Sequence, residues 1–274
     1  GISSVLEIGG GDGFILRYLK TQGVKRLVNI EPSLPESYES EGISYLKKFA
    51  SESVDLGTSF DLVLSIGVFE HIEKINDVLR FCKKHLSPGG RLLFSVPNSD
   101  GCLRSGDPSL FLHQHIHYYT ESSLKNLLAV HGFSVIHVDA NYDSLIVSAV
   151  MDAAVKENAD PRVVYDSYST YLDRVIKNVQ TLLTQSPGKT IVHGANGALN
   201  NLLGWMGGTY DYTLVDNDET KHGKTYFGKK VHAMKELKFP DYAQVVIIPQ
   251  AFLTEIKSAY ENAGFKGKIS GILD

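Results

Sequence analysis

Short apolar runs alternate with segments of helical periodicity through the first half of the chain. Runs rich in Val, Ile, Leu and Phe predict buried strands at residues 4–8, 25–31, 43–46, 60–65, 91–96, 134–139 and 144–150. Apolar residues three and four apart predict helices at 14–22, 74–85 and 121–131, the last capped by Thr120. A turn is expected at 87–90. This alternation favours a doubly wound α/β sheet over residues 1–150.

The second half begins with helical periodicity over residues 151–185, which a Ser-Pro-Gly break ends. A new strand, a glycine turn and a helix-like segment follow from Thr190. Further strands are expected at 212–218, 244–248 and 268–273, and a solvated hairpin at 221–230. We therefore expect a helical linker at 151–186 and a smaller α/β lobe at 187–274.

The turn after the first predicted strand is rich in glycine and is flanked by two carboxylates. That strand ends at Glu7, and Glu31 ends the next one. Between them lie Gly9, Gly10, Gly11 and Gly13. Glycine lets the main chain turn sharply and approach a ligand, and an acid after the second strand of such a fold binds ribose. These residues predict a pocket for a nucleoside cofactor; a corner without a ligand is the alternative.

The glycine spacing discriminates between cofactors. A dinucleotide-binding G-x-G-x-x-G motif that begins at Gly9 would place its third glycine at Phe14. The chain instead reads E-x-G-x-G-x-G from Glu7 to Gly13, which resembles the first motif of class I S-adenosyl-L-methionine (SAM) methyltransferases. The resemblance implies SAM as the cofactor, with Glu7 facing its amino group. Asp12 is expected to cap the following helix.

Two further segments extend this resemblance. Residues 60–72 are similar to the fourth-strand motif of these methyltransferases, and residues 86–98 to the fifth-strand motif. The resemblance implies an α/β fold with a Rossmann-like class I methyltransferase sheet and a second, smaller Rossmann-like lobe. Phe49 either lines the adenine or belongs to the core. The implied cofactor-binding residues are Glu7, Gly9, Gly10, Gly11, Gly13, Glu31, Pro32, Phe49, Ser65 and Ile66.

Three histidines alternate within residues 111–119. On a strand, His113, His115 and His117 would share one face and could reach a metal ion. We expect no metal there, because no fourth ligand can be nominated. The alternatives are histidines hydrogen-bonded beneath a loop and a histidine that faces the substrate. The aromatic neighbours favour the last of these.

The same stretch resembles the Y-x-E-H segment of sugar C-methyltransferases, which act on nucleotide-linked 4-keto sugars. In that family the segment removes a proton beside the ketone, and the carbanion attacks the sulfonium methyl. By position, its histidine is His115, its glutamate is Gln114 and its tyrosine is Leu112, so only the histidine is retained. The lobe at 187–274 also resembles the family's C-terminal lobe. The family's upstream cysteine-rich zinc module has no counterpart in these residues.

These departures leave the acceptor atom open. A hydroxyl or an α-carbon must lose a proton, which requires a base with a pKa near neutrality. His115 fits that role, whereas the amide of Gln114 does not ionise. Either His115 acts alone, or His71, His113 or His117 completes a proton relay. Methylation of a sugar oxygen is therefore as compatible with these residues as methylation of carbon.

Composition adds few constraints. A net charge of −4 gives no electrostatic reason to expect nucleic acid or a membrane as a partner. No apolar run approaches the about 20 residues of a membrane helix, and no signal peptide is recognisable. Two cysteines in 274 residues favour reduced thiols in the cytoplasm over a disulfide framework. The chain starts without methionine, so we expect residues before Gly1.

The sequence leaves two roles open for the second lobe and three possibilities for the activity. The lobe, with Asp216 at a strand end, either closes over a sugar or nucleotide-sugar substrate or pairs subunits as a scaffold in a homodimer. The expected function is SAM-dependent methyl transfer to a small molecule of that kind. One alternative is an NAD(P)-dependent oxidoreductase, which the glycine spacing opposes. The other is a catalytically idle SAM-binding protein, which the absent glutamate and tyrosine favour.

Overall fold

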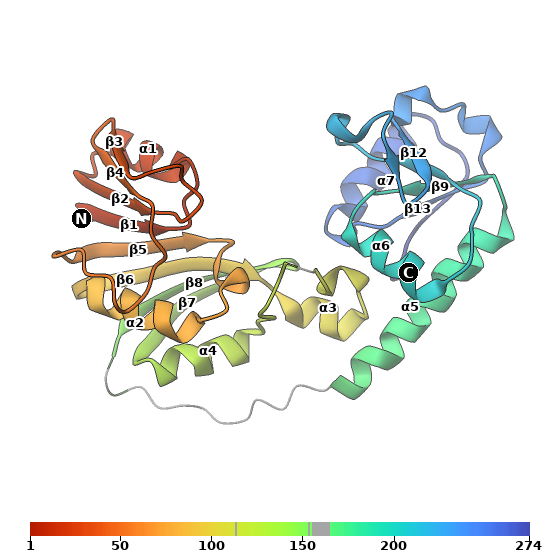
Figure 1. The fold of residues 1–274 in the computed structure, drawn as a ribbon. Coiled ribbons are helices and arrows are strands. Elements are labelled where there is room, and N and C mark those ends of the chain that lie inside the picture. The colour runs from red at the N-terminus through yellow and green to blue at the C-terminus, as the bar shows by residue number, and fades with distance from the viewer. Residues whose placement is uncertain (113, 153, 155–164) are drawn as a thin grey trace. The chain divides into compact units, whose positions relative to one another are not determined.

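The computed structural model describes residues 1–112, 114–152, 154 and 165–274, with side chains from residue 170 onward in the last range. Figure 1 shows the elements in chain order. The chain separates into two compact units, one of residues 1–100 and 114–162 and one of residues 101–113 and 163–274. Each unit is built on one sheet.

The first unit contains an eight-stranded sheet. Across it lie β3 (Tyr38–Ser40), β4 (Ile43–Leu46), β2 (Arg26–Ile30), β1 (Ser4–Ile8), β5 (Phe60–Ile66), β6 (Leu86–Pro97), β8 (Ser144–Met151) and β7 (Phe133–Ala140). The strands from β4 across to β6 are parallel, whereas β3, β8 and β7 pair antiparallel with their neighbours. The carboxyl ends of the parallel strands therefore meet along one edge, where open α/β sheets bind ligands.

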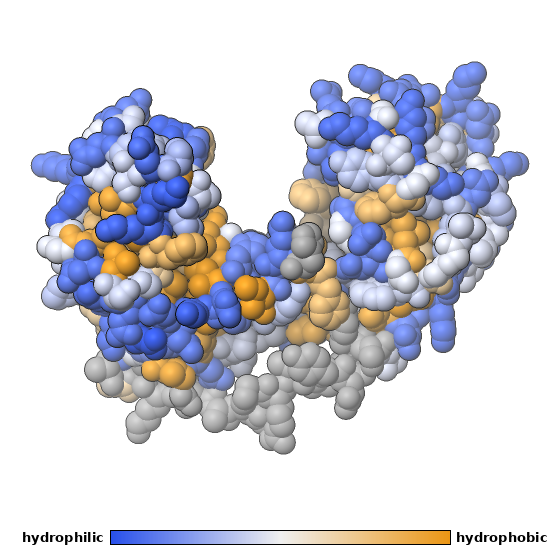
Figure 2. Space-filling model, in the orientation of Figure 1, coloured by the Kyte–Doolittle hydropathy of each residue, from blue (hydrophilic) through white to orange (hydrophobic). Residues whose placement is uncertain are grey.

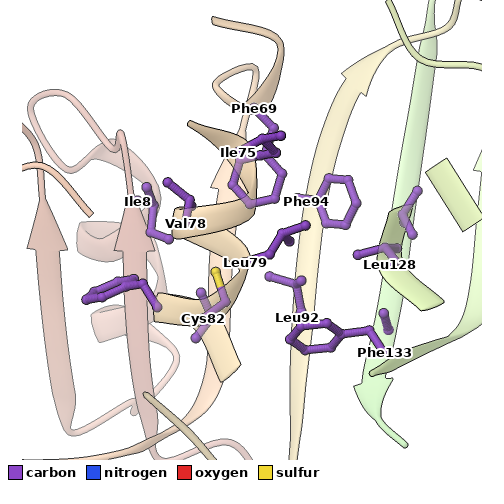
Figure 3. Packing of buried hydrophobic residues seen from close by; sticks show 14 of the residues in the cluster. Ile8, Phe69, Ile75, Val78, Leu79, Cys82, Leu92, Phe94, Leu128 and Phe133 are labelled. Atoms are coloured by element: carbon purple, nitrogen blue, oxygen red, sulfur yellow. The ribbon is translucent and has the colours of Figure 1, made fainter. Parts of the chain in front are cut away.

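Helices cover both faces of this sheet, because successive side chains of a strand point to opposite faces. Leu6 and Ile8 pack with α2 (Ile75–His85) and α4 (Glu121–Val130) in the core that Figure 3 draws. Val5 packs on the other face with Leu16 of α1 (Phe14–Thr21). Strand β1 is consequently buried throughout its length, and this includes the side chain of Glu7.

The predicted strands and helices of this unit are present with shifted bounds. Thr120 caps α4 as expected, since its hydroxyl oxygen accepts a hydrogen bond from the Ser123 N–H at 3.1 Å. The hydrophobic pattern does not predict strand β3, because its residues are exposed and pair only with β4. The turn expected at 87–90 is wrong. Strand β6 already begins at Leu86, and these residues form an irregularity in its pairing with β5.

The second unit has the same architecture on a smaller scale. Its sheet has the order β11 (Thr225–Tyr226), β12 (Lys229–His232), β10 (Thr213–Val215), β9 (Thr190–His193), β13 (Gln244–Ile247) and β14 (Lys268–Gly271). All but β11 are parallel, and β11 forms the expected hairpin with β12. Helices α5 (Tyr165–Gln185) and α6 (Gly197–Met206) cover one face, and α7 (Leu253–Asn262) covers the other. The smaller Rossmann-like lobe is confirmed.

Residues 101–113 interrupt the first unit in sequence but pack within the second. Helix α3 (Ser99–Ser105) leads into this segment, and the short turn η2 (Pro108–Leu110) follows. The Asn201 amide of α6 donates hydrogen bonds to the carbonyls of Pro108 at 2.9 Å and Phe111 at 2.7 Å. Pro108 and Phe111 precede Asn201 by 93 and 90 residues, so no local sequence pattern predicts these hydrogen bonds.

The surface of both units is mainly hydrophilic in the view of Figure 2, with smaller hydrophobic areas between the polar ones. Apolar residues are instead concentrated in the cores on the two faces of each sheet. None of the helices in the described part of the chain combines the length and the hydropathy that a membrane-spanning segment requires.

Candidate active site

The turn after β1 brings the main chain unusually close to the end of that strand. Gly9, Gly11 and Gly13 all have positive φ angles, which glycine adopts without strain. Gly10 lies outside that region, but a Cβ atom there would be 2.5 Å from the Glu7 carboxyl group and 2.8 Å from Asn29 Oδ1. A side chain at Gly10 would displace the Glu7 carboxyl group. At Gly9, Gly11 and Gly13 the positive φ angles favour glycine.

Glu7 ends β1 with a carboxylate that is almost completely buried. Glu7 is only 2 % exposed, and its Oε2 atom has no hydrogen-bond partner among the described residues. Burial, and to a smaller extent the charge of Asp12, raise the pKa of Glu7 to about 7. A buried carboxylate without a partner is costly unless a donor or a cation reaches it. The amino group of a SAM molecule fits that need.

Two polar residues at the end of β2 hold the glycine turn. Asn29 Oδ1 accepts a hydrogen bond from the Gly10 N–H at 3.2 Å, and its Nδ2 donates to the Gly11 carbonyl at 2.9 Å. Glu31 Oε2 accepts from the Gly11 N–H at 3.3 Å. Glu31 thus lies beside the turn, where a ribose-binding acid is expected. Sequence reasoning missed Asn29, although a fully buried polar residue within an apolar strand was the available signal.

The remaining predicted cofactor residues differ in exposure. Phe49 is 76 % exposed, so the alternative that it belongs to the core is wrong. Ile66, at the end of β5, is 43 % exposed, and Pro32 is half-buried. Ser65 is buried, and its hydroxyl donates to the Ile8 carbonyl at 3.1 Å. Exposed apolar side chains near the strand ends suit the flat, apolar faces of a ligand.

Asp12 does not cap the helix that follows the turn. The N-cap residue of α1 is Gly13, and no side chain caps this helix. The Asp12 carboxylate instead forms a salt bridge with Arg17 at 2.9 Å. The expectation is wrong because the turn continues one residue beyond Asp12 before the helix begins.

A second polar group follows β5, in the 3-10 turn η1 (Phe69–His71). Glu70 is 3 % exposed, its Oε2 has no partner in the described part of the chain, and burial raises its pKa. His71 Nδ1 lies 2.8 Å from the Gln114 carbonyl, so this nitrogen carries the hydrogen. The other nitrogen, His71 Nε2, lies 3.7 Å from Glu70 Oε1. Sequence reasoning chose His71 and missed the adjacent Glu70.

His115 completes this group. Its ring centroid lies 5.0 Å from that of His71, and the rings meet edge to face. Burial, and then the charge of His71, lower the pKa of His115. Its imidazole is therefore neutral near pH 7 and able to accept a proton. The structure brings His115, His71 and Gln114 together, although Gln114 contributes its main-chain carbonyl and leaves its side chain exposed.

The histidine stretch is a loop and not a strand in residues 114–119, so the expected alternation of faces is wrong there. The N–H groups of Ile116 and His117 both donate to the Glu70 carbonyl, at 2.8 and 3.1 Å, and thereby fix the loop beside η1. His117 Nε2 lies 2.9 Å from the Ile72 carbonyl, which matches a hydrogen-bonded histidine beneath a loop. His113 lies outside the described residues.

Glu70, His71 and His115 also form a group that could hold a metal ion, because one ligand atom of each lies within 4.8 Å of the others. A tetrahedral zinc ion, with bonds of about 2.1 Å, keeps its ligands roughly 3.4 Å apart. The side chains would therefore have to move together to bind it. A shared proton would likewise need the side chains to approach, because hydrogen-bonded atoms lie about 3 Å apart and His71 Nε2 lies 3.7 Å from Glu70 Oε1.

The glycine turn and this polar group are neighbours in the first unit. A Cβ atom on Gly9 would lie 2.5 Å from a methyl group of Val68, the residue that precedes η1. The carboxyl edge of the first sheet thus carries both Glu7, whose Oε2 has no partner among the described residues, and the neutral His115. A cationic group of a ligand could bind to Glu7 there. This arrangement suits a cationic donor and an acceptor that must lose a proton.

Two of the curated proteins that are similar to this chain differ in how much of it they cover. The chain is 27 % identical over 258 residues to the C-methyltransferase NovU of Streptomyces niveus, which covers 83 % of this chain and 61 % of the relative. It is 28 % identical over 102 residues to a ubiquinone biosynthesis O-methyltransferase of Azorhizobium caulinodans, covering 34 % of this chain and 40 % of that protein. The chain therefore spans less than two thirds of the length of these relatives.

The solved structure of a SAM-dependent methyltransferase from Mesorhizobium loti aligns with 54 % of this chain and 90 % of its own, at 20 % identity and a TM-score of 0.42. Residues 3–138 match the family model of the methyltransferase domain. That match covers the glycine turn, Glu31, η1 and His115. The first unit thus carries a methyltransferase domain, and the chain is similar to SAM-dependent methyltransferases.

Proposed function

We propose that the chain transfers a methyl group from SAM to a small molecule, a sugar or nucleotide-sugar, at carbon or oxygen. The observation that carries the proposal is the buried, unpartnered carboxylate of Glu7 beside a turn in which Gly10 leaves no room for a side chain. When bound, SAM supplies an electrophilic methyl group on a sulfonium. The family match favours this chemistry over the nicotinamide-dependent alternative.

In this proposal Glu7 receives the amino group of the cofactor, and Glu31 receives its ribose hydroxyls. The turn of Gly9, Gly10, Gly11 and Gly13 lets the backbone approach the methionyl part. Phe49 and Ile66 offer exposed apolar surface to the adenine, and Pro32 and Ser65 shape the strand ends beside it.

His115 is the proposed general base. Its lowered pKa keeps it neutral, and the edge of His71 lies against it. A relay of the acceptor's proton from His115 to His71 would require the two rings to approach, because their centroids lie 5.0 Å apart and His71 Nε2 lies 3.7 Å from Glu70 Oε1. Gln114 holds the tautomer of His71 through its carbonyl, which accepts the hydrogen on Nδ1. This relay serves a hydroxyl or an α-carbon acceptor equally well.

The substrate class and setting are further parts of the proposal. The match to the C-methyltransferase NovU spans 83 % of the chain and so extends into the second unit. In this proposal the substrate is of the sugar type, and residues 187–274 bind it. The proposed cofactor domain lies within residues 1–150, apart from the segment 101–113 that packs with the second unit. Of the linker expected at 151–186, α5 belongs to the core of the second unit, and residues 153 and 155–164 lie outside the described residues. Both cysteines are buried and form no disulfide with each other, which supports a reducing, cytoplasmic setting. A scaffold role of the second unit in a homodimer is the other use that we propose for it.

The test is calorimetry with S-adenosylhomocysteine (SAH) and NADH, followed by methyl transfer to nucleotide-linked keto sugars and hydroxy sugars. We expect heat with SAH and none with NADH, and product only in the presence of SAM. Heat with NADH alone would overturn the proposal. Tight SAH binding with no SAM consumption on any acceptor would favour an idle SAM-binding protein.

A further inference from the structure

A row of side chains with polar atoms crosses three neighbouring strands beneath the glycine turn. Glu7 of β1 is in register with Asn29 of β2, and Asn29 is in register with Tyr45 of β4. Residues in register on parallel strands point to the same face of a sheet. Glu7, Asn29 and Tyr45 are 2 %, 0 % and 3 % exposed. Strands covered on both faces are usually apolar, so this buried row needs a separate explanation.

Tyr45, the third member of the row, contacts the second half of the turn. The other two members contact Gly10 and Gly11, as described above. The Tyr45 hydroxyl donates a long hydrogen bond of 3.3 Å to the Asp12 carbonyl. A Cβ atom on Gly13 would lie 2.5 Å from the Tyr45 hydroxyl oxygen and 2.8 Å from its Cε1 atom. The ring therefore lies directly against the backbone of Gly13, and the row supports the turn along its whole length.

Two neighbouring side chains fix the positions of Tyr45 and Asp12. The Tyr38 ring stacks on the Tyr45 ring, with centroids 4.6 Å apart and planes 10° from parallel. Arg17 of α1 donates to the same Asp12 carbonyl and also to the Asp12 carboxylate, the latter at 2.9 Å. Asp12 does not cap α1, but its backbone is held by β4 on one side and by α1 on the other.

The composition of the turn makes such support valuable. Gly9, Gly11 and Gly13 have positive φ angles, and glycine loses more conformational freedom on ordering than any other residue. If the turn were disordered in the unliganded protein, a ligand would have to order it on binding, and that cost would lower the affinity. A turn that is already held in place avoids this cost.

We propose that Tyr45 is a positioning residue of the cofactor site, which holds Asp12 and Gly13 in the binding conformation before the cofactor arrives. Tyr45 acts through the turn and takes no part in methyl transfer. Its effect is therefore on cofactor affinity and not on kcat. The identity of the ligand as SAM rests on the proposed function, whereas the ordering of the turn by Tyr45 is a property of the unliganded protein.

The experiment compares two tyrosine variants of the whole chain. Tyr45→Phe removes only the hydroxyl, and SAH affinity, measured by calorimetry, should fall about three- to tenfold, because one hydrogen bond that holds the turn is lost. KM for SAM should rise by the same factor, with kcat unchanged. The matched control is Tyr38→Phe, which removes the same atom from the stacked ring that is 39 % exposed. This control should leave SAH affinity unchanged.

Hydrogen exchange in the unliganded protein is a second readout that needs no cofactor. The Gly13 N–H donates to the Gly10 carbonyl at 2.7 Å within the turn, so its exchange rate reports the order of the turn. In Tyr45→Phe this rate should rise about three- to tenfold. The N–H groups of β1 should exchange as in the wild type, whereas a general loss of stability would accelerate both.

The outcomes separate the positioning role from the proposed function. If the wild type binds no SAH, the proposed function fails, and the exchange of the Gly13 N–H still tests the role of Tyr45. If the wild type binds SAH and the two tyrosine variants bind it equally, the inference is overturned. It is also overturned if the Gly13 N–H exchanges at the wild-type rate in Tyr45→Phe, or if β1 is accelerated equally.

Discussion

The two units carry the same strand–turn–helix corner with different electrostatics. In the first, Glu7 Oε2 is buried without a hydrogen-bond partner among the described residues, and no described basic side chain forms a salt bridge with Glu31. In the second, Asp216 is paired with Lys221, and the strand end carries the neutral His193. The first corner suits a cationic group, whereas the acid of the second is already neutralised within the protein. A common backbone thus carries corners of different charge, which a few side chains set.

The largest expected effect separates the chemistry of the first unit from that of the second. His115→Ala should lower kcat by about 10²- to 10⁴-fold, because the acceptor loses its general base. SAH affinity, measured by calorimetry, should not change. His137→Ala, at an exposed histidine in β7, is the control and should retain full activity. Near-normal turnover of the His115 variant would remove His115 from the mechanism.

Gly10→Ala should disrupt the first corner specifically. The added Cβ atom would lie 2.5 Å from the Glu7 carboxyl group, so the site has to shift. We expect SAH affinity to fall about 100-fold and the free energy of unfolding to fall by about 1–3 kcal/mol. Calorimetry and thermal denaturation measure the two effects.

The control for that variant is Gly204→Ala in α6. A Cβ atom there meets nothing within 4 Å, and alanine is favoured within a helix. SAH affinity should therefore stay at its wild-type value, and the free energy of unfolding should stay the same or rise by up to about 1 kcal/mol. If Gly10→Ala bound SAH as tightly as this control, the first corner would not be the cofactor site.

Glu7 should make cofactor binding depend on pH. With a pKa of about 7, its carboxyl group is protonated in the unliganded protein below neutrality, whereas an ammonium group requires the carboxylate. Binding then releases one proton, so SAH affinity should rise about tenfold per pH unit up to about pH 7 and level off above it. Glu7→Gln should bind weakly at every pH. A wild-type affinity that is flat from pH 5 to 8 would contradict the assigned role.

The smallest expected effect concerns the pH dependence of the rate. Burial and the charge of His71 both lower the pKa of His115 from 6.5, so the acid limb of kcat/KM should lie below pH 6.5. His71→Gln removes one of these causes and should move the limb upward by less than about one pH unit. Dialysis against EDTA should leave the profile unchanged. Loss of activity that zinc restores would instead make Glu70, His71 and His115 a metal centre.

Much of the fold follows from local pattern. Each buried strand in the first unit is flanked by helices, so its apolar run is visible without knowledge of its partners. The elements that the sequence does not predict are those without such an apolar run. Strand β3 is short and exposed, and β6 extends through a Pro-Gly-Gly sequence that is typical of a turn.

The candidate active site likewise has residues that the sequence predicts and residues that only the structure reveals. Glycine spacing and two acids at strand ends could be read directly, because backbone conformation and chain order fix them. Asn29 is visible only as a polar residue within an apolar strand, and its two hydrogen bonds to the glycine turn appear only in the structure. Glu70 could not be predicted, because its importance comes from its burial and from an Oε2 atom without a partner among the described residues. The tautomer of His71 likewise depends on a carbonyl that lies 43 residues away.

By itself, the sequence determined two α/β units and the glycine corner of the first, since these rest on hydrophobic periodicity and on conformations that favour glycine. The motifs at that corner carried the resemblance to methyltransferases. Only the tertiary structure decided that one carboxylate oxygen each of Glu7 and Glu70 is buried without a partner among the described residues, that residues 101–113 pack with the second unit, and that Asp216 is paired with Lys221. Burial and pairing are properties of residues distant in the chain. They set the charge of each corner, and no local pattern encodes them.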